Sequence, residues 1–135
     1  MTGRPDTYVL VVDDEPDVLN LVEMQLERSG FEVRTAESGL EALRVLRESG
    51  PPSIAVIDVA MPELSGLDLV RVLRGRSDTA GLPVVFLSAR VLPSDIAAGE
   101  ALGASYVTKP FTRSSLIHAI DRELGEKTTP VAAEG

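Results

Sequence analysis

The chain has 135 residues, of which 21 are acidic and 13 basic, giving a formal net charge of −8. This length suits one domain, and the hydrophobic share of 44% and charged share of 25% are those of an ordinary globular protein. The composition therefore excludes collagen-like and disordered chains. The apolar runs fall short of the ~20 residues of a membrane-spanning helix, so we expect no membrane insertion.

Cysteine is absent, histidine occurs once and lysine only twice. The lack of cysteine excludes disulfides, thiolate nucleophiles and cysteine zinc sites, and a single histidine, His118, excludes a His-rich metal site. The N-terminus shows no signal peptide, so we expect a cytoplasmic protein. Because phosphate contacts need clustered Lys and Arg, the acidic balance argues against direct nucleic-acid binding.

Short apolar segments alternate with longer amphipathic segments along the chain. We expect strands at 8–12, 31–36, 53–57, 83–87 and 106–108. We expect amphipathic helices after them, at 16–29, 39–48, 66–74, 94–102 and 112–124.

Residues typical of helix ends support these boundaries. Pro16 suits a first helical turn, Gly30 a C-terminal cap, and Ser94 and Thr112 the N-cap positions. The helix at 94–102 is the weakest of the five, because its apolar face is mostly alanine and Gly99 interrupts it.

Five strand–helix units in succession predict a parallel sheet with helices on both faces. The expected class is α/β, a single (βα)5 flavodoxin-like doubly wound domain with a five-stranded sheet of order 2-1-3-4-5. A (βα)8 barrel would need ~250 residues. We expect the domain at 7–125, after an N-terminal extension at 1–6 and before a flexible tail or truncated linker at 126–135.

Polar side chains stand where the central strands of this sheet end, which is where such folds bind ligands. Asp13 and Asp14 follow the first strand, Asp58 the third, Ser88 the fourth and Lys109 the fifth. Each has an ordinary structural explanation by itself, such as a helix-dipole complement, a turn residue or a surface lysine. Their joint occurrence at the strand ends favours a functional site.

Clustered carboxylates repel one another unless a cation is present, and Mg²⁺ prefers such hard oxygen ligands. With Mg²⁺ held by Asp13, Asp14 and Asp58, one oxygen of Asp58 would be able to attack a phosphoryl group and form an aspartyl phosphate. Mn²⁺ is the alternative metal. Lys109 would supply a second cationic contact, and Ser88 would donate a hydrogen bond to a phosphoryl oxygen.

Five segments extend this pattern along the chain: VLVVDDEPDVLNLV, AESGLEAL, DVAMPELSGLDLV, PVVFLSA and GASYVTKPF. They resemble the receiver domain of bacterial two-component response regulators, the CheY-like superfamily, over roughly residues 7–125. The resemblance implies a phosphorelay signalling domain rather than an enzyme, with only self-catalysed phosphotransfer and autodephosphorylation.

The resemblance also assigns roles to single residues. Asp58 matches the phosphoacceptor, which takes its phosphoryl group from a sensor histidine kinase or a phosphotransfer protein in a Mg²⁺-dependent reaction. Asp13 and Asp14 match the acidic pair that binds the metal with Asp58, and the backbone carbonyl of Ala60 would complete the protein ligands. Arg90 and Ala60 occupy the positions that tune how fast water removes the phosphoryl group.

The remaining matches concern the response to phosphorylation. Lys109 matches the phosphate-contacting lysine and is expected to precede a cis peptide bond to Pro110. Ser88 matches the switch hydroxyl, and Tyr106 the aromatic switch that moves with it. The face formed by the fourth helix, fifth strand and fifth helix would then change shape and bind a downstream protein effector or a second copy of the chain.

Three alternatives stay open. A phosphatase of haloacid-dehalogenase type would need a second acidic residue where Ala60 stands. A flavodoxin would have a Ser/Thr/Gly-rich first loop, whereas the acidic residues at 13–15 would repel phosphate. A non-phosphorylated pseudo-receiver is disfavoured because every matching site position is filled. We expect no effector domain, which leaves a stand-alone receiver or the receiver part of a longer regulator.

Overall fold

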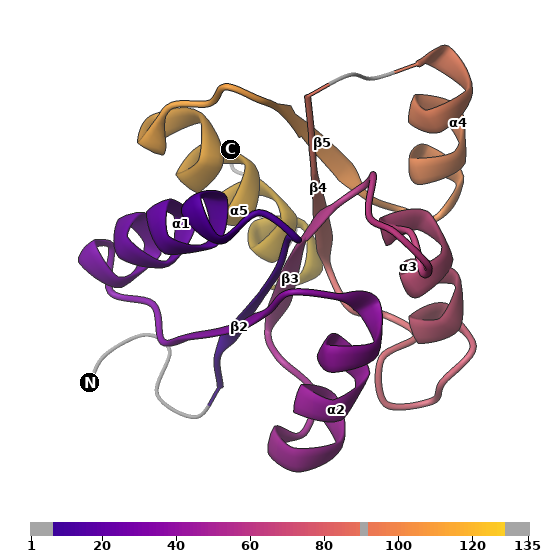
Figure 1. Ribbon diagram of the computed structural model, residues 1–135. Helices are drawn as coiled ribbons and strands as arrows, with labels where there is room; N and C mark the ends of the chain where they lie inside the picture. Colours follow the sequence, from indigo (N-terminus) through magenta and orange to yellow (C-terminus); the bar gives the residue numbers. More distant parts are fainter. Residues whose placement is uncertain (1–6, 90–91, 129–135) are drawn as a thin grey trace.

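The computed structural model describes residues 7–89 and 92–128 and has one parallel sheet of order β2-β1-β3-β4-β5 (Figure 1). The strands are β1 (Val9–Val12), β2 (Val33–Ala36), β3 (Ile54–Asp58), β4 (Val84–Ser88) and β5 (Ser105–Thr108). The helices are α1 (Pro16–Arg28), α2 (Gly39–Ser49), α3 (Gly66–Arg74), α4 (Pro93–Ala101) and α5 (Arg113–Thr128). The expected α/β class and strand order are confirmed.

The two faces of the sheet are covered by different helices, as Figure 1 shows. Alternate residues of a strand point to opposite faces, so Val9 and Val11 pack with α1 and α5, whereas Leu10 and Val12 pack with α2 and α3. Every residue of β1, β3 and β4 is buried. This double burial explains why these strands are continuous apolar runs rather than alternating ones.

Most element ends lie within two residues of the expected positions, and two expectations were wrong. Helix α4 begins at Pro93, so Ser94 lies inside its first turn, and the N-cap residue Leu92 makes no side-chain capping bond. Helix α5 continues through Gly125 to Thr128 rather than ending at 124. A glycine inside a helix costs only about 1 kcal/mol, so Gly125 does not by itself end α5.

Other helix ends follow the expected local chemistry. Thr112 caps α5, since its hydroxyl accepts a hydrogen bond from the Ser115 N–H at 3.0 Å. Gly30 follows α1 with φ +94, a left-handed conformation that glycine adopts without a steric penalty. Within the described parts of the chain, no helix is long and apolar enough to cross a membrane.

Replacing Gly30 should reveal the cost of that backbone conformation. Gly30→Ala is expected to lower the free energy of unfolding by about 1–2 kcal/mol, because a β-carbon disfavours positive φ. Gly81→Ala is the matched control, since an added β-carbon meets nothing within 4 Å at either position. Of these two glycines, Gly30 has positive φ and Gly81 does not. Urea denaturation measures both; equal effects would contradict a conformational role for Gly30.

Candidate functional site

A cavity of about 450 Å³ opens at the carboxyl edge of the sheet. Its lining comes from the ends of β1, β3, β4 and β5 and from the loops that follow them: Asp14, Glu15, Asp58, Ala60, Ser88, Ala89, Leu92 and Lys109. The structure thus brings together five of the predicted site residues. Asp13 contacts Lys109 there, whereas Tyr106 faces a different hollow, and Arg90 lies outside the described residues.

Three carboxylates form the acidic part of this site. Asp13 is fully buried, Asp58 is 5% exposed, and Asp14 is exposed to solvent. One oxygen from each lies within 4.8 Å of the others. Hard oxygen donors this close fit Mg²⁺ or Mn²⁺, which commonly bind carboxylates together with waters and phosphate oxygens.

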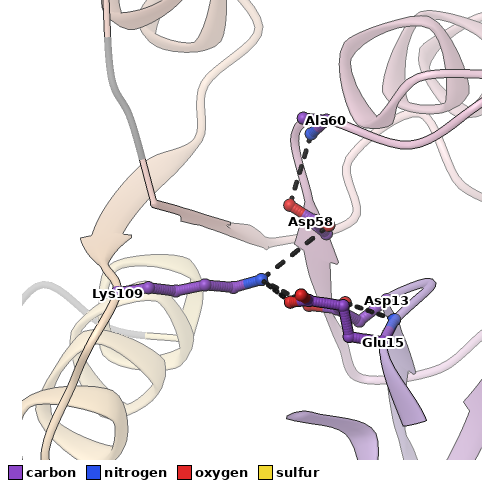
Figure 2. A network of polar contacts seen from close by, with 5 residues as sticks. All are labelled: Asp13, Glu15, Asp58, Ala60 and Lys109. Carbon is purple, nitrogen blue, oxygen red and sulfur yellow. Dashed lines mark hydrogen bonds and ion pairs between the residues drawn. The ribbon is translucent and has the colours of Figure 1, made fainter.

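Lys109 reaches these carboxylates from the far side of the cavity, as Figure 2 shows. Its Nζ lies 2.9 Å from Asp13 Oδ2, 3.2 Å from Glu15 Oε1 and 3.8 Å from Asp58 Oδ2. Burial by itself would lower the pKa of Lys109, but the hydrogen bond to Asp13 and the charge of Asp58 outweigh it, and the net pKa is raised. The lysine is therefore held as an ammonium ion.

The Asp58 carboxylate is buried beside other carboxylates. Its Oδ1 accepts a hydrogen bond from the Ala60 N–H at 3.2 Å, and its Oδ2 faces Lys109 (Figure 2). Burial, followed by the charge of Asp13, raises the pKa of Asp58 to about 7, although Lys109 and the Ala60 N–H act in the opposite direction. A divalent cation here would relieve that repulsion.

Two residues that the sequence did not single out shape this site. Glu15 pairs with Lys109. Its position directly after Asp13 and Asp14 in the sequence is the signal that could have identified it. Gly66 is the first residue of α3 and packs against the backbone at the end of β3. Its N–H donates a hydrogen bond to the Val59 carbonyl at 2.9 Å. A β-carbon at Gly66 would lie 2.1 Å from the Asp58 carbonyl oxygen, so only glycine fits. Nothing in the sequence distinguishes this close approach from an ordinary turn glycine.

The ring of Tyr106, a residue of β5, contacts Phe86 of β4 and Gly99 of α4. Its ring centroid is 5.3 Å from that of Phe86, and the side chain is half-buried. The ring also lies against Gly99, where an added β-carbon would be 2.7 Å from the phenol oxygen. The glycine that weakens α4 as a helix is therefore the residue that makes room for the tyrosine.

The expected cis peptide bond between Lys109 and Pro110 is present. Comparison with known proteins agrees with this geometry, because a family model described as "Response regulator receiver domain" matches residues 9–121. The chain belongs to the response regulator receiver domain family.

Several curated relatives of this receiver domain come from mycobacteria. The probable transcriptional regulatory protein TcrX of Mycobacterium tuberculosis is 40% identical over an alignment of 136 positions, which covers 98% of this chain and 56% of TcrX. The transcriptional regulatory protein PrrA of the same species is 45% identical over 117 residues, 86% of this chain and 49% of PrrA. The chain thus spans about half the length of these relatives.

A solved structure confirms the fold. The chemotaxis protein CheY4 of Vibrio cholerae superposes with a TM-score of 0.80 at 31% identity, and the match covers 86% of this chain and 97% of CheY4. As a member of this family, the chain is a signalling domain of two-component systems.

The raised pKa of Asp58 should appear in the pH dependence of the receiver's stability. Because the folded pKa lies above the unfolded value, the unfolded chain binds fewer protons between about pH 4 and 7, so the contribution of Asp58 to stability falls as pH rises through this window. Asp58→Asn removes this titration and should stabilise the protein more at about pH 8 than at about pH 5. Urea denaturation in metal-free buffer checks this; a pH-independent difference would contradict it.

The contact between Tyr106 and Gly99 has its own test. Gly99→Ala should stabilise a Tyr106→Ala variant by about 0.5–1 kcal/mol, because alanine favours a helix over glycine. The same change should give no gain in the wild type, where the ring must first move off α4. Urea denaturation of the four proteins measures this coupling. An equal gain in both backgrounds would show that the ring does not restrict position 99.

Proposed function

We propose that Asp58 accepts a phosphoryl group from a sensor histidine kinase or phosphotransfer protein. The observation that carries the proposal is the Asp58 carboxylate, buried and raised in pKa, beside an ammonium ion and two further carboxylates. In the transfer, a carboxylate oxygen of Asp58 bonds to phosphorus while the donor's bond to phosphorus breaks, and the donor leaves with that electron pair.

The proposed ligands of Mg²⁺ or Mn²⁺ are the carboxylates of Asp13, Asp14 and Asp58 and the backbone carbonyl of Ala60. When bound, the ion would supply positive charge to the carboxylates and to the incoming phosphoryl oxygens. Asp13 and Asp58 are the buried members of the set, so they fix the geometry, whereas Asp14 is open to solvent on the cavity wall.

Three other side chains would act on the phosphoryl group. Lys109 would move from its carboxylate partners to a phosphoryl oxygen, and the Ser88 hydroxyl, in the wall of the same cavity, would donate a hydrogen bond. Ala60 is exposed on the cavity wall, and its small side chain would leave room for the water that removes the phosphoryl group. Arg90, the other proposed tuning residue, lies outside the described residues.

We propose that phosphorylation shifts the population between two conformations of the surface formed by α4, β5 and α5. Phosphorylation adds about −1.5 to −2 charge at Asp58, which would draw Ser88 and Lys109 toward the phosphoryl group and allow Tyr106 to repack. The surface affected is the α4–β5–α5 face, where residues of all three elements line a hollow of about 800 Å³. We propose this face as the binding surface for a downstream protein or a second copy of the chain.

The domain proposal follows from the same reasoning. Residues 7–125 would form the receiver, with an N-terminal extension at 1–6 and a tail or linker at 126–135, although α5 itself continues to Thr128. The curated relatives are named as transcriptional regulators and are about twice as long. In a chain of that length, the α4–β5–α5 face would transmit the signal to the remaining part.

Acetyl phosphate with Mg²⁺ tests the acceptor. Intact mass measurement should show a gain of one phosphoryl group in the wild type and none in Asp58→Asn, because the amide is not a nucleophile for phosphorus. Asp68→Asn is the matched control, since Asp68 is an exposed carboxylate on α3 that pairs with Arg71 and should leave uptake unchanged. Omission of the divalent ion should abolish the adduct; an adduct on Asp58→Asn would overturn the assignment.

A further inference from the structure

Glu15 lies at the rim of the cavity and has no role in the mechanism above. Its side chain is 62% exposed, yet Oε1 lies 3.2 Å from the Nζ of Lys109, which is 94 residues away in the chain. Figure 2 shows the two side chains meeting beside Asp13. This contact joins the start of α1 to the end of β5.

The Glu15 side chain does not bond to the backbone of its own helix, although its position would allow it. Glu15 is the N-cap residue of α1, where a side-chain oxygen commonly accepts a hydrogen bond from the first helical turn. No such bond forms at Glu15, and its backbone N–H donates to Asp13 Oδ1 at 2.9 Å. The Glu15 carboxylate is therefore directed toward Lys109 rather than toward its own helix.

The distances around Lys109 indicate what this contact does. The ammonium group is within hydrogen-bond distance of Asp13 and Glu15, but its 3.8 Å separation from Asp58 is that of an ion pair only. A phosphoryl group on Asp58 would add oxygens that compete with Glu15 for the Lys109 ammonium group. A lysine on a flexible stem can turn toward those oxygens, and a full contact there would weaken its contact with Glu15.

We propose that Glu15 is a positioning residue that restrains Lys109 on the α1 side of the cavity and so slows phosphoryl transfer to Asp58. The inference rests on the proposed function and concerns the rate of transfer rather than the acceptor. Because exposed ion pairs change an equilibrium by no more than about fivefold, the restraint modulates transfer without preventing it.

The rate of phosphorylation by acetyl phosphate with Mg²⁺ tests this role in three variants. Glu15→Gln should raise the rate about two- to fivefold, since a neutral amide no longer forms the ion pair. Glu15→Asp keeps the negative charge but is one methylene shorter, so it should raise the rate similarly. Glu37→Gln removes an exposed carboxylate that follows β2 and should leave the rate unchanged.

The pattern across these variants separates the explanations. If only the charge of Glu15 repelled the donor, Glu15→Gln would accelerate transfer and Glu15→Asp would not. If Glu15 instead held Lys109 ready for use, both variants would slow transfer. Either pattern, or unchanged rates, overturns the proposal, as does an equal acceleration by Glu37→Gln.

A second measurement follows the lysine directly and needs no phosphorylation. The chain has only two lysines, so ¹⁵N NMR of the side-chain amines should give two signals, and Lys127→Arg identifies that of Lys109. Both Glu15 variants should shift the Lys109 signal, and Glu37→Gln should not; an unmoved signal overturns the contact. A wild type that takes up no phosphoryl group would instead overturn the proposed function.

Discussion

Charge balance at the carboxyl edge of the sheet is the constraint on which the site depends. Asp13, Asp58 and Glu15 share one ammonium group, that of Lys109, and two of these carboxylates are buried. Burial and the neighbouring charge of Asp13 together raise the pKa of Asp58 to about 7 despite the presence of Lys109. A site in this condition favours any added cation and responds strongly when the charge on Asp58 changes.

The fold creates this condition through its topology. Parallel strands all present their carboxyl ends at one edge, so side chains that are far apart in sequence meet there. The apolar burial of β1, β3 and β4 on both faces fixes those ends in place. Gly66 adds a close backbone contact beside Asp58, which sets the path of the loop that carries Ala60. The core thus supplies the rigidity that a charged cluster needs.

The far end of α4 is held differently from its start. Arg74 of α3 donates hydrogen bonds to the carbonyls of Leu102, at 2.9 Å, and of Leu82, at 2.7 Å, and so ties the end of α4 to its neighbours. At its start, α4 has no side-chain cap. An element anchored at one end is suited to movement at the other, which lies nearer the site.

The sequence by itself determined the alternation of strands and helices, the strand order and the members of the charged cluster other than Glu15. It did so because hydrophobic period, turn residues and strand ends are local signals, and parallel topology then places the strand ends together. Only the tertiary structure decided which carboxylates Lys109 contacts, why Gly66 must be glycine, and that Gly99 makes room for Tyr106. These features depend on distances between segments remote in the chain, and no local pattern encodes such distances.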